Sequence, residues 1–140
     1  MGCYNSTVVN ASADQAWTAM RKFHDVSWSA NVLSSLEAEG DPEQPGAKRV
    51  LNGVFFETLI SLDDENRICR YSIDDGPEAV SKDNVAGYVG HIQIFPVTDE
   101  GTAFVIWSST WASSGGGVAA FCNPIYQALL ADLKAHFASA

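Results

Sequence analysis

The chain has 140 residues, a formal net charge of −9 at pH 7 and a hydrophobic fraction of 46%. This length suits one domain spanning residues 1–140, and the hydrophobic fraction is sufficient for a core and too high for a disordered chain. The negative charge argues against nucleic acid as a partner, because it repels a phosphate backbone and few basic residues are present to neutralise one.

The first predicted element is a strand over residues 3–9, which are partly β-branched and are followed by Asn10. Gly2 and Cys3 also fit a loose pattern for N-terminal myristoylation with a second acyl chain. That pattern is short and degenerate, so we favour a strand over a lipidated N-terminus.

The next segment predicts helical structure. Ser12 begins a capping box, and apolar residues within 13–23 recur at helical spacing on one face. The polar segment 24–31 contains Trp28 and predicts either a second short helix or a turn. The chain then becomes extended over residues 33–39.

The middle of the chain predicts an antiparallel meander. Segments suited to strands alternate with short clusters of turn-forming residues, which is typical of strands that pair with their neighbours in sequence. The five expected strands cover residues 47–52, 54–62, 68–73, 85–96 and 102–111.

A long helix is expected near the end of the chain. Gly115-Gly116-Gly117 ends the sheet, and apolar residues recur at helical spacing over 118–137. Pro124 lies inside this pattern, so either the helix begins near Asn123, or a longer helix is kinked at the proline. The order of strand, helices, sheet and helix describes an α+β fold with one helix packed across an antiparallel sheet.

Several kinds of site have no signature in the sequence. Cys3, Cys69 and Cys122 lie far apart without C-x-x-C spacing, which argues against a disulfide framework and a zinc site. No metal motif, phosphate loop or dinucleotide motif occurs, so we expect no metal and no cofactor. Neither an apolar membrane span nor a signal peptide is visible, and we expect a cytoplasmic protein.

Local motifs spread along the chain carry a resemblance to a known family. They are Trp17, residues 23–28, 45–49, 56–59 and 62–64, Arg67, Tyr71, Ile73, residues 88–96, Gly101-Thr102 and Trp107. In this order they resemble the START-like superfamily, specifically its polyketide cyclase/dehydrase and lipid-transport family. The resemblance implies a helix-grip fold, in which a curved antiparallel sheet wraps around a long C-terminal helix and two short N-terminal helices are present. It also implies an internal cavity for a small hydrophobic molecule such as a lipid or polyketide.

Strand alternation predicts which side chains face this cavity. Arg49 and Glu57 flank a turn at Asn52-Gly53, so we expect them on paired strands, where they can form an ion pair. The other expected ligand-binding residues are mostly apolar or aromatic: Trp28, Leu51, Phe55, Leu59, Tyr71, Tyr88, Ile92, Trp107, Ser109, Trp111, Phe121 and Ile125.

These residues leave more than one function open. We favour a binding protein in which Arg49 orients one polar group of a hydrophobic ligand. The alternative is a polyketide cyclase or dehydratase-like enzyme with Glu57 as acid/base and Arg49 as electrostatic clamp. A purely structural salt bridge and a protein-interaction module are the remaining interpretations. The sequence does not indicate the ligand or the oligomeric state.

Overall fold

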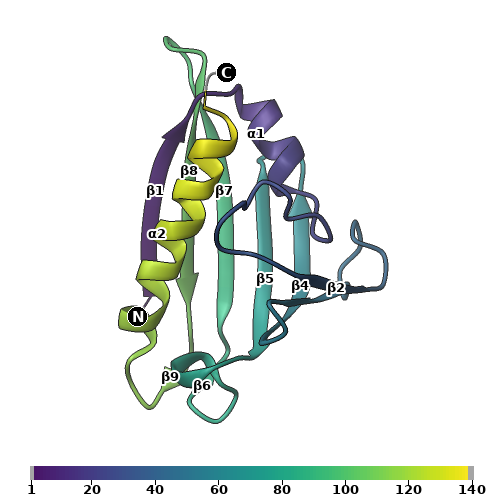
Figure 1. The fold of residues 1–140 in the computed structure, drawn as a ribbon, viewed down its shortest axis with the longest axis vertical. Helices are drawn as coiled ribbons and strands as arrows, with labels where there is room; N and C mark the ends of the chain where they lie inside the picture. The colour runs from purple at the N-terminus through teal and green to yellow at the C-terminus, as the bar shows by residue number, and fades with distance from the viewer. Residues whose placement is uncertain (1, 139–140) are drawn as a thin grey trace.

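A seven-stranded antiparallel sheet is the largest structural unit of the protein (Figure 1). The computed structural model describes residues 2–138. Its elements, in chain order, are β1 (Gly2–Val9), α1 (Ala13–Met20), β2 (Leu36–Glu39), β3 (Lys48–Leu51), β4 (Phe55–Asp63), β5 (Ile68–Asp75), the 3₁₀ turn η1 (Glu78–Val80), β6 (Val85–Ala86), β7 (Val89–Val97), β8 (Thr102–Thr110), β9 (Ser113–Ser114) and α2 (Val118–His136).

The strand order is β1-β8-β7-β5-β4-β3-β2. From β2 to β8 the sheet follows the chain as a meander, except that β6 leaves it and pairs with β9 in a separate two-stranded sheet. The first strand, β1, joins beside the last long strand, β8. The two ends of the sheet-forming sequence are therefore neighbours, which brings β1 next to the C-terminal helix.

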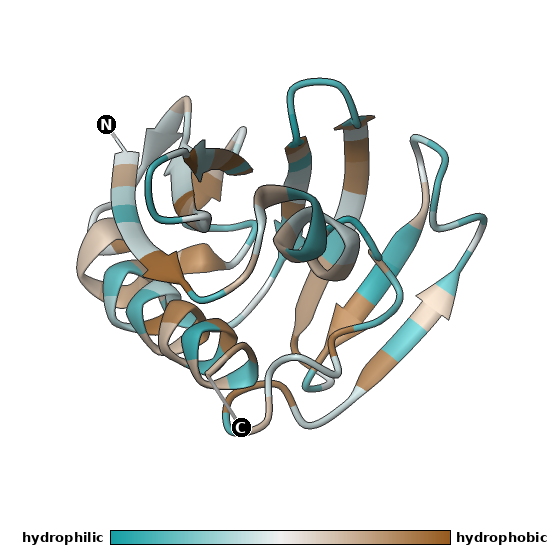
Figure 2. Cartoon of the chain, turned by 90° about the horizontal axis from the view of Figure 1, so that it is seen from above, coloured by the Kyte–Doolittle hydropathy of each residue, from teal (hydrophilic) through white to brown (hydrophobic). Residues whose placement is uncertain are grey.

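The long helix α2 packs against β1, and the sheet curves round one side of it (Figure 2). The inner face of the sheet and the facing side of α2 supply the core, in which Val105 and Leu133 are fully buried. This arrangement confirms the helix-grip fold that the family resemblance implies.

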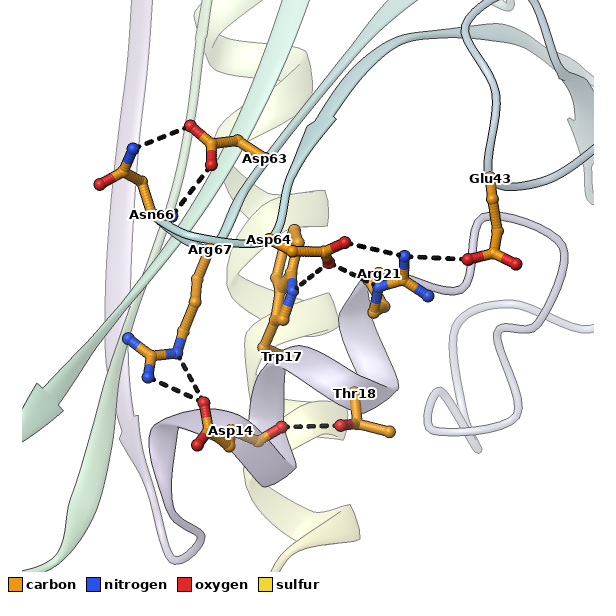
Figure 3. Close-up of polar contacts among 9 residues, drawn as sticks. All are labelled: Asp14, Trp17, Thr18, Arg21, Glu43, Asp63, Asp64, Asn66 and Arg67. Atoms are coloured by element: carbon orange, nitrogen blue, oxygen red, sulfur yellow. Dashed lines mark hydrogen bonds and ion pairs between the residues drawn. The ribbon is translucent and has the colours of Figure 1, made fainter.

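Polar contacts fasten α1 to the turn between β4 and β5 (Figure 3). The Trp17 indole N–H donates to Asp64 at 2.8 Å, and the Arg21 guanidinium forms an ion pair with the same carboxylate at 2.8 Å. Arg67 pairs with Asp14 at the other end of the helix at 2.8 Å. Because these contacts come from both ends of α1, they fix its orientation across the end of the sheet.

The structure differs from the sequence expectations at two places. Among residues 2–138 there is one short N-terminal helix rather than two, because segment 24–31 forms turns. There Asp25 accepts a hydrogen bond from the Ser27 backbone N–H at 2.9 Å, a local contact that competes with helix formation. The strand expected over residues 85–96 is interrupted at Gly87, where φ is +69°, and divides into β6 and β7.

Of the two alternatives that the sequence leaves open for the last helix, the structure has the longer one. The helix begins at Val118, directly after Gly117 in the left-handed conformation, and Pro124 lies inside it. Because proline has no N–H, the Ala120 carbonyl lacks its usual helical hydrogen bond. Neither helix within residues 2–138 has the length and hydropathy of a membrane-spanning segment.

Candidate functional site

A small, partly open cavity lies between the inner face of the sheet and α2. Its free volume is about 40 Å³, which is room for only a few water molecules. Strands β3, β4, β5 and β8, the helix α2 and the loop before β2 all contribute to its wall. The lining residues are Val26, Trp28, Leu33, Arg49, Leu51, Phe55, Glu57, Tyr71, Ile73, Trp107, Cys122, Ile125, Tyr126 and Leu129.

Arg49 and Glu57 form the charged end of this cavity. They are direct partners on β3 and β4, as the position of the intervening turn predicts. Two guanidinium nitrogens of Arg49, Nε and Nη2, approach the same carboxylate oxygen, Oε1, at 2.9 and 2.8 Å. The remaining nitrogen, Nη1, donates to the Phe23 carbonyl at 3.0 Å, and the guanidinium carbon lies 4.1 Å from the centre of the Phe23 ring. The cation is therefore held in one position.

Burial and pairing act in opposite directions on Glu57. The Glu57 side chain is 6% exposed, and burial raises its pKa although the Arg49 charge acts to lower it. Within residues 2–138, no hydrogen bond reaches its second oxygen, Oε2. Glu57 thus combines a raised pKa with an oxygen that is available to a ligand or to a proton.

Three buried tyrosines extend the polar part of the site toward α2. The Tyr71 hydroxyl accepts a hydrogen bond from the Trp107 indole N–H at 2.9 Å and lies 3.3 Å from the Tyr126 hydroxyl. The Tyr126 hydroxyl is also hydrogen-bonded to that of Tyr88. Burial raises the pKa of all three phenols, so they stay neutral and act as hydrogen-bonding groups.

Gly90 makes room for this cluster. It pairs with Tyr71 across β5 and β7, and a Cβ atom at position 90 would lie 2.1 Å from Cζ of the Tyr71 ring. A side chain here would therefore displace the tyrosine. The absence of a side chain at this position lets the phenol lie flat against the sheet.

The cavity wall contains part of the residue set expected from the sequence. The expected residues that line it are Trp28, Arg49, Leu51, Phe55, Glu57, Tyr71, Trp107 and Ile125. The expected residues outside its wall are Leu59, Tyr88, Ile92, Ser109, Trp111 and Phe121. Several of the latter do face inward, but neighbouring side chains pack over them; Trp111, for example, stacks on Tyr88 with ring centres 5.9 Å apart. Alternation identifies the inner face of a strand but not where space remains above it.

Six wall residues were absent from the expected ligand-binding set. One of them, Ile73 on β5, alternates with Tyr71 toward the same face of the sheet. Cys122, Tyr126 and Leu129 lie on the same face of α2 as Ile125, and their helical spacing is the signal that could have identified them. Val26 and Leu33 come from the irregular loop before β2, where no periodic pattern marks the side chains that point inward.

A larger hollow of about 620 Å³ lies outside the cavity, over β2, β3 and β4. It is open to solvent and lined largely by charged residues such as Glu37, Lys48, Asp75 and Lys82. We assign the candidate site to the smaller cavity under α2, because a site that holds a small molecule is usually concave and mostly apolar. Residues 2–138 contain no cluster of His, Cys, Asp or Glu suited to a metal ion.

Solved structures support the fold. A protein of Nitrosospira multiformis is 40% identical and superposes with a TM-score of 0.94, covering 99% of this chain and 97% of that one. An uncharacterized Bacillus thuringiensis protein is 22% identical with a TM-score of 0.82, over 99% of this chain and 100% of that one. The ginseng major latex-like protein 151 from Panax ginseng shares only 12% identity but has a TM-score of 0.78, over 99% and 98% of the two chains.

Sequence comparison gives the family. No curated protein matches the chain. Residues 3–138 match the family described as polyketide cyclase / dehydrase and lipid transport, which covers nearly all of the sequence. The family match agrees with the helix-grip fold described above. The chain therefore belongs to the polyketide cyclase / dehydrase and lipid transport family of START-like proteins.

Proposed function

We propose that this protein binds a small hydrophobic molecule, such as a lipid or polyketide, in the cavity between the sheet and α2. The observation that carries the proposal is the cavity wall, which is apolar and aromatic except for a few polar groups, chiefly Arg49, Glu57 and the hydroxyls of Tyr71 and Tyr126. Such a wall favours an apolar body, and a few placed polar groups orient it. The family to which the chain belongs supports the same function.

Arg49 and the tyrosine hydroxyls are the groups that we expect to orient the ligand. The Arg49 guanidinium is held by Glu57 and Phe23, so it meets a ligand oxygen without a loss of side-chain freedom. Trp28 and Trp107 form adjoining parts of the apolar wall, with ring centres 6.0 Å apart. Because the free volume is about 40 Å³, a ligand must displace part of this wall when it binds.

Tryptophan fluorescence tests the proposal directly, since Trp28 and Trp107 both line the cavity. Fatty acids, aromatic polyketides and flavonoids are titrated into the protein while its fluorescence and its melting temperature are followed. We expect saturable quenching by at least one class, with a parallel rise in melting temperature. A panel in which no compound binds above background would refute the proposal.

A second candidate function is catalysis of a dehydration or cyclisation. The observation that favours it is Glu57, whose pKa is raised and whose Oε2 lacks a partner within residues 2–138. A carboxyl group of this kind can take a proton from a carbon acid or give one to a leaving hydroxyl, while Arg49 stabilises the developing negative charge on a carbonyl oxygen.

The Glu57→Gln variant separates catalysis from binding. If Glu57 moves a proton, the variant binds a compound from the panel with nearly unchanged affinity but no longer converts it, as followed by mass spectrometry. The exposed Asp99→Asn variant controls for the loss of one negative charge. Equal loss of binding and folding in Glu57→Gln would instead support a structural salt bridge.

Three further expectations from the sequence stay predictions: that the protein does not bind nucleic acid, that it is cytoplasmic, and that its N-terminus is not acylated.

A further inference from the structure

The loop before β2 closes one side of the cavity. We define residues 26–35 as the strap. Val26, Trp28 and Leu33 of the strap line the cavity, so the strap is part of the wall rather than a distant connection. Trp28 is 5% exposed, and its ring packs against that of Trp107. A ligand that reaches the cavity from this side has to move the strap.

One carboxylate on α2 holds the middle of the strap. Asp132 is 5% exposed, and its Oδ2 atom accepts hydrogen bonds from the Ser29 hydroxyl at 2.7 Å and from the backbone N–H groups of Asn31 and Val32, both at 2.9 Å. Its Oδ1 atom accepts a fourth bond from the Asn31 side chain at 2.9 Å. Hydrogen bonds to a charged acceptor are stronger than neutral ones, so this single side chain is the main polar attachment of the strap.

The other end of the strap is attached to the β3–β4 hairpin. Asn52, at φ +54°, accepts the Ser34 N–H at 2.8 Å through its side-chain oxygen and donates to the Val32 carbonyl at 2.9 Å. Its backbone N–H donates to the Ser35 carbonyl at 3.0 Å. Within residues 2–138, every hydrogen bond from the strap to a distant part of the chain ends on Asp132 or Asn52.

These two attachments differ in what they join. Asn52 connects the strap to the β3–β4 hairpin of the sheet, whereas Asp132 connects it across the cavity to the helix. Breaking the contact with Asp132 therefore frees the strap from α2 and leaves it attached at the sheet. The site then opens between Trp28 on the strap and the helix face that carries Cys122 and Leu129.

We propose that Asp132 is a latch and that release of the strap from it admits the ligand to the cavity. This inference rests on the proposed ligand-binding function. Asp132 is a positioning residue, because it acts through the strap and does not itself line the cavity. The latch explains how a cavity with a free volume of about 40 Å³ can accept a larger molecule.

The thiol of Cys122 reports opening of the strap without any ligand. Cys122 lines the cavity and is 4% exposed, so a maleimide reaches it only when the cavity opens. The experiment measures its alkylation rate at constant pH in a Cys3→Ala/Cys69→Ala background. We expect Asp132→Asn to raise the rate about tenfold and Asn31→Ala, which removes one hydrogen bond to Asp132, to raise it less. Asp99→Asn, with the same change of charge at an exposed site, leaves it unchanged.

Alkylation of Cys69 distinguishes local opening from general loosening. Cys69 is 3% exposed on β5 and lies outside the cavity wall. In a Cys3→Ala/Cys122→Ala background, we expect Asp132→Asn to leave its alkylation rate unchanged. Equal acceleration at Cys69 and Cys122 would show that Asp132 only stabilises the whole fold, and no acceleration at Cys122 would show that Asp132 does not hold the strap. Either result overturns the proposal.

Association kinetics then connect the strap to binding. The uncharged fluorescent probe N-phenyl-1-naphthylamine is mixed with the protein in a stopped-flow instrument. We expect about tenfold faster association with Asp132→Asn than with the unsubstituted chain or Asp99→Asn. Identical association rates would overturn the role in ligand access. If neither the probe nor any compound of the panel binds while Cys122 alkylation still responds to Asp132→Asn, ligand binding fails as a function and the strap remains a moving element.

Discussion

At Arg49 and Glu57 the cost of burying charge is offset by pairing. Removing only one partner would leave an uncompensated charge in a site where both side chains are almost fully buried, and such changes typically cost about 3–5 kcal/mol. The pair is therefore a constraint on the fold as well as a polar group of the cavity. Its second oxygen, Glu57 Oε2, has no hydrogen-bond partner within residues 2–138, which distinguishes the pair from one with fully satisfied partners.

Gly90→Ala tests the packing of the tyrosine cluster. Because the added Cβ would lie 2.1 Å from the Tyr71 ring, the phenol must move away from its contacts with Trp107 and Tyr126. We expect a loss of about 1–3 kcal/mol in the free energy of unfolding, measured by urea denaturation. Gly101→Ala gives the comparison, because no atom lies within 4 Å of its added Cβ and only backbone strain at φ +66° opposes it. Equal losses in the two variants would contradict the packing account.

The stability of the protein should depend on pH through Asp132. Burial acts to raise the pKa of Asp132, but the hydrogen bonds from Ser29, Asn31 and Val32 outweigh it and lower the pKa. In the unfolded chain an aspartate titrates near pH ~3.9, so just below that pH the unfolded state binds more protons. The contribution of Asp132 is therefore complete above this value and is lost as the pH falls through the lower folded pKa.

Urea denaturation of the unsubstituted chain and Asp132→Asn at a series of pH values measures this contribution. We expect the difference in unfolding free energy to be largest at neutral pH and to shrink as the solution is made more acid than about pH 4. The exposed Asp99→Asn variant accounts for the general effect of one charge. A difference that stays constant down to strongly acid pH would show that the Asp132 carboxylate does not hold the strap through its charge.

At the scale of the elements, regular patterns in the sequence predicted regular structure. The turn at Asn52-Gly53 and the alternation around it predicted that Arg49 and Glu57 are partners. The strap had no such pattern, because its conformation depends on hydrogen bonds to Asp132 and Asn52, which are distant in sequence. The sequence also does not decide where α2 begins, since a proline is compatible both with the first turn of a helix and with a kink inside one.

Pro124→Ala decides how α2 is built. In the structure Pro124 is inside the helix, so alanine would restore the N–H that bonds to the Ala120 carbonyl. We expect the free energy of unfolding to rise by about 1–2 kcal/mol, after allowance for the greater freedom of alanine in the unfolded chain. Pro45→Ala, in the loop before β3, measures that unfolded-state effect. A loss of stability in Pro124→Ala similar to that in Pro45→Ala would indicate that the helix begins near Asn123.

At the scale of the whole molecule, the order of elements and motifs in the sequence is sufficient to predict the helix-grip fold and the family. The volume and outline of the cavity could not be predicted in the same way. They depend on how Trp111 packs on Tyr88, and on which side chains of the strap and α2 meet above the sheet. The sequence therefore predicts the existence of an inner face better than it predicts the shape of the space over that face.

The central claim is that the cavity between the sheet and α2 is the ligand site. Ile73 on β5 lines the cavity beside Glu57, its pairing partner on β4, whereas Ile60 on β4 is 41% exposed. Ile73→Trp and Ile60→Trp therefore add the same side chain on opposite faces of the sheet. Circular dichroism verifies that both variants are folded at the assay temperature, since overpacking costs about 1–3 kcal/mol.

The decisive measurement is the affinity of N-phenyl-1-naphthylamine for these two variants and for the unsubstituted chain. If the cavity is the site, the tryptophan at position 73 occupies it and weakens binding at least about tenfold, while Ile60→Trp binds like the unsubstituted chain. Undiminished binding to a folded Ile73→Trp variant would contradict the account and would locate the ligand elsewhere on the protein.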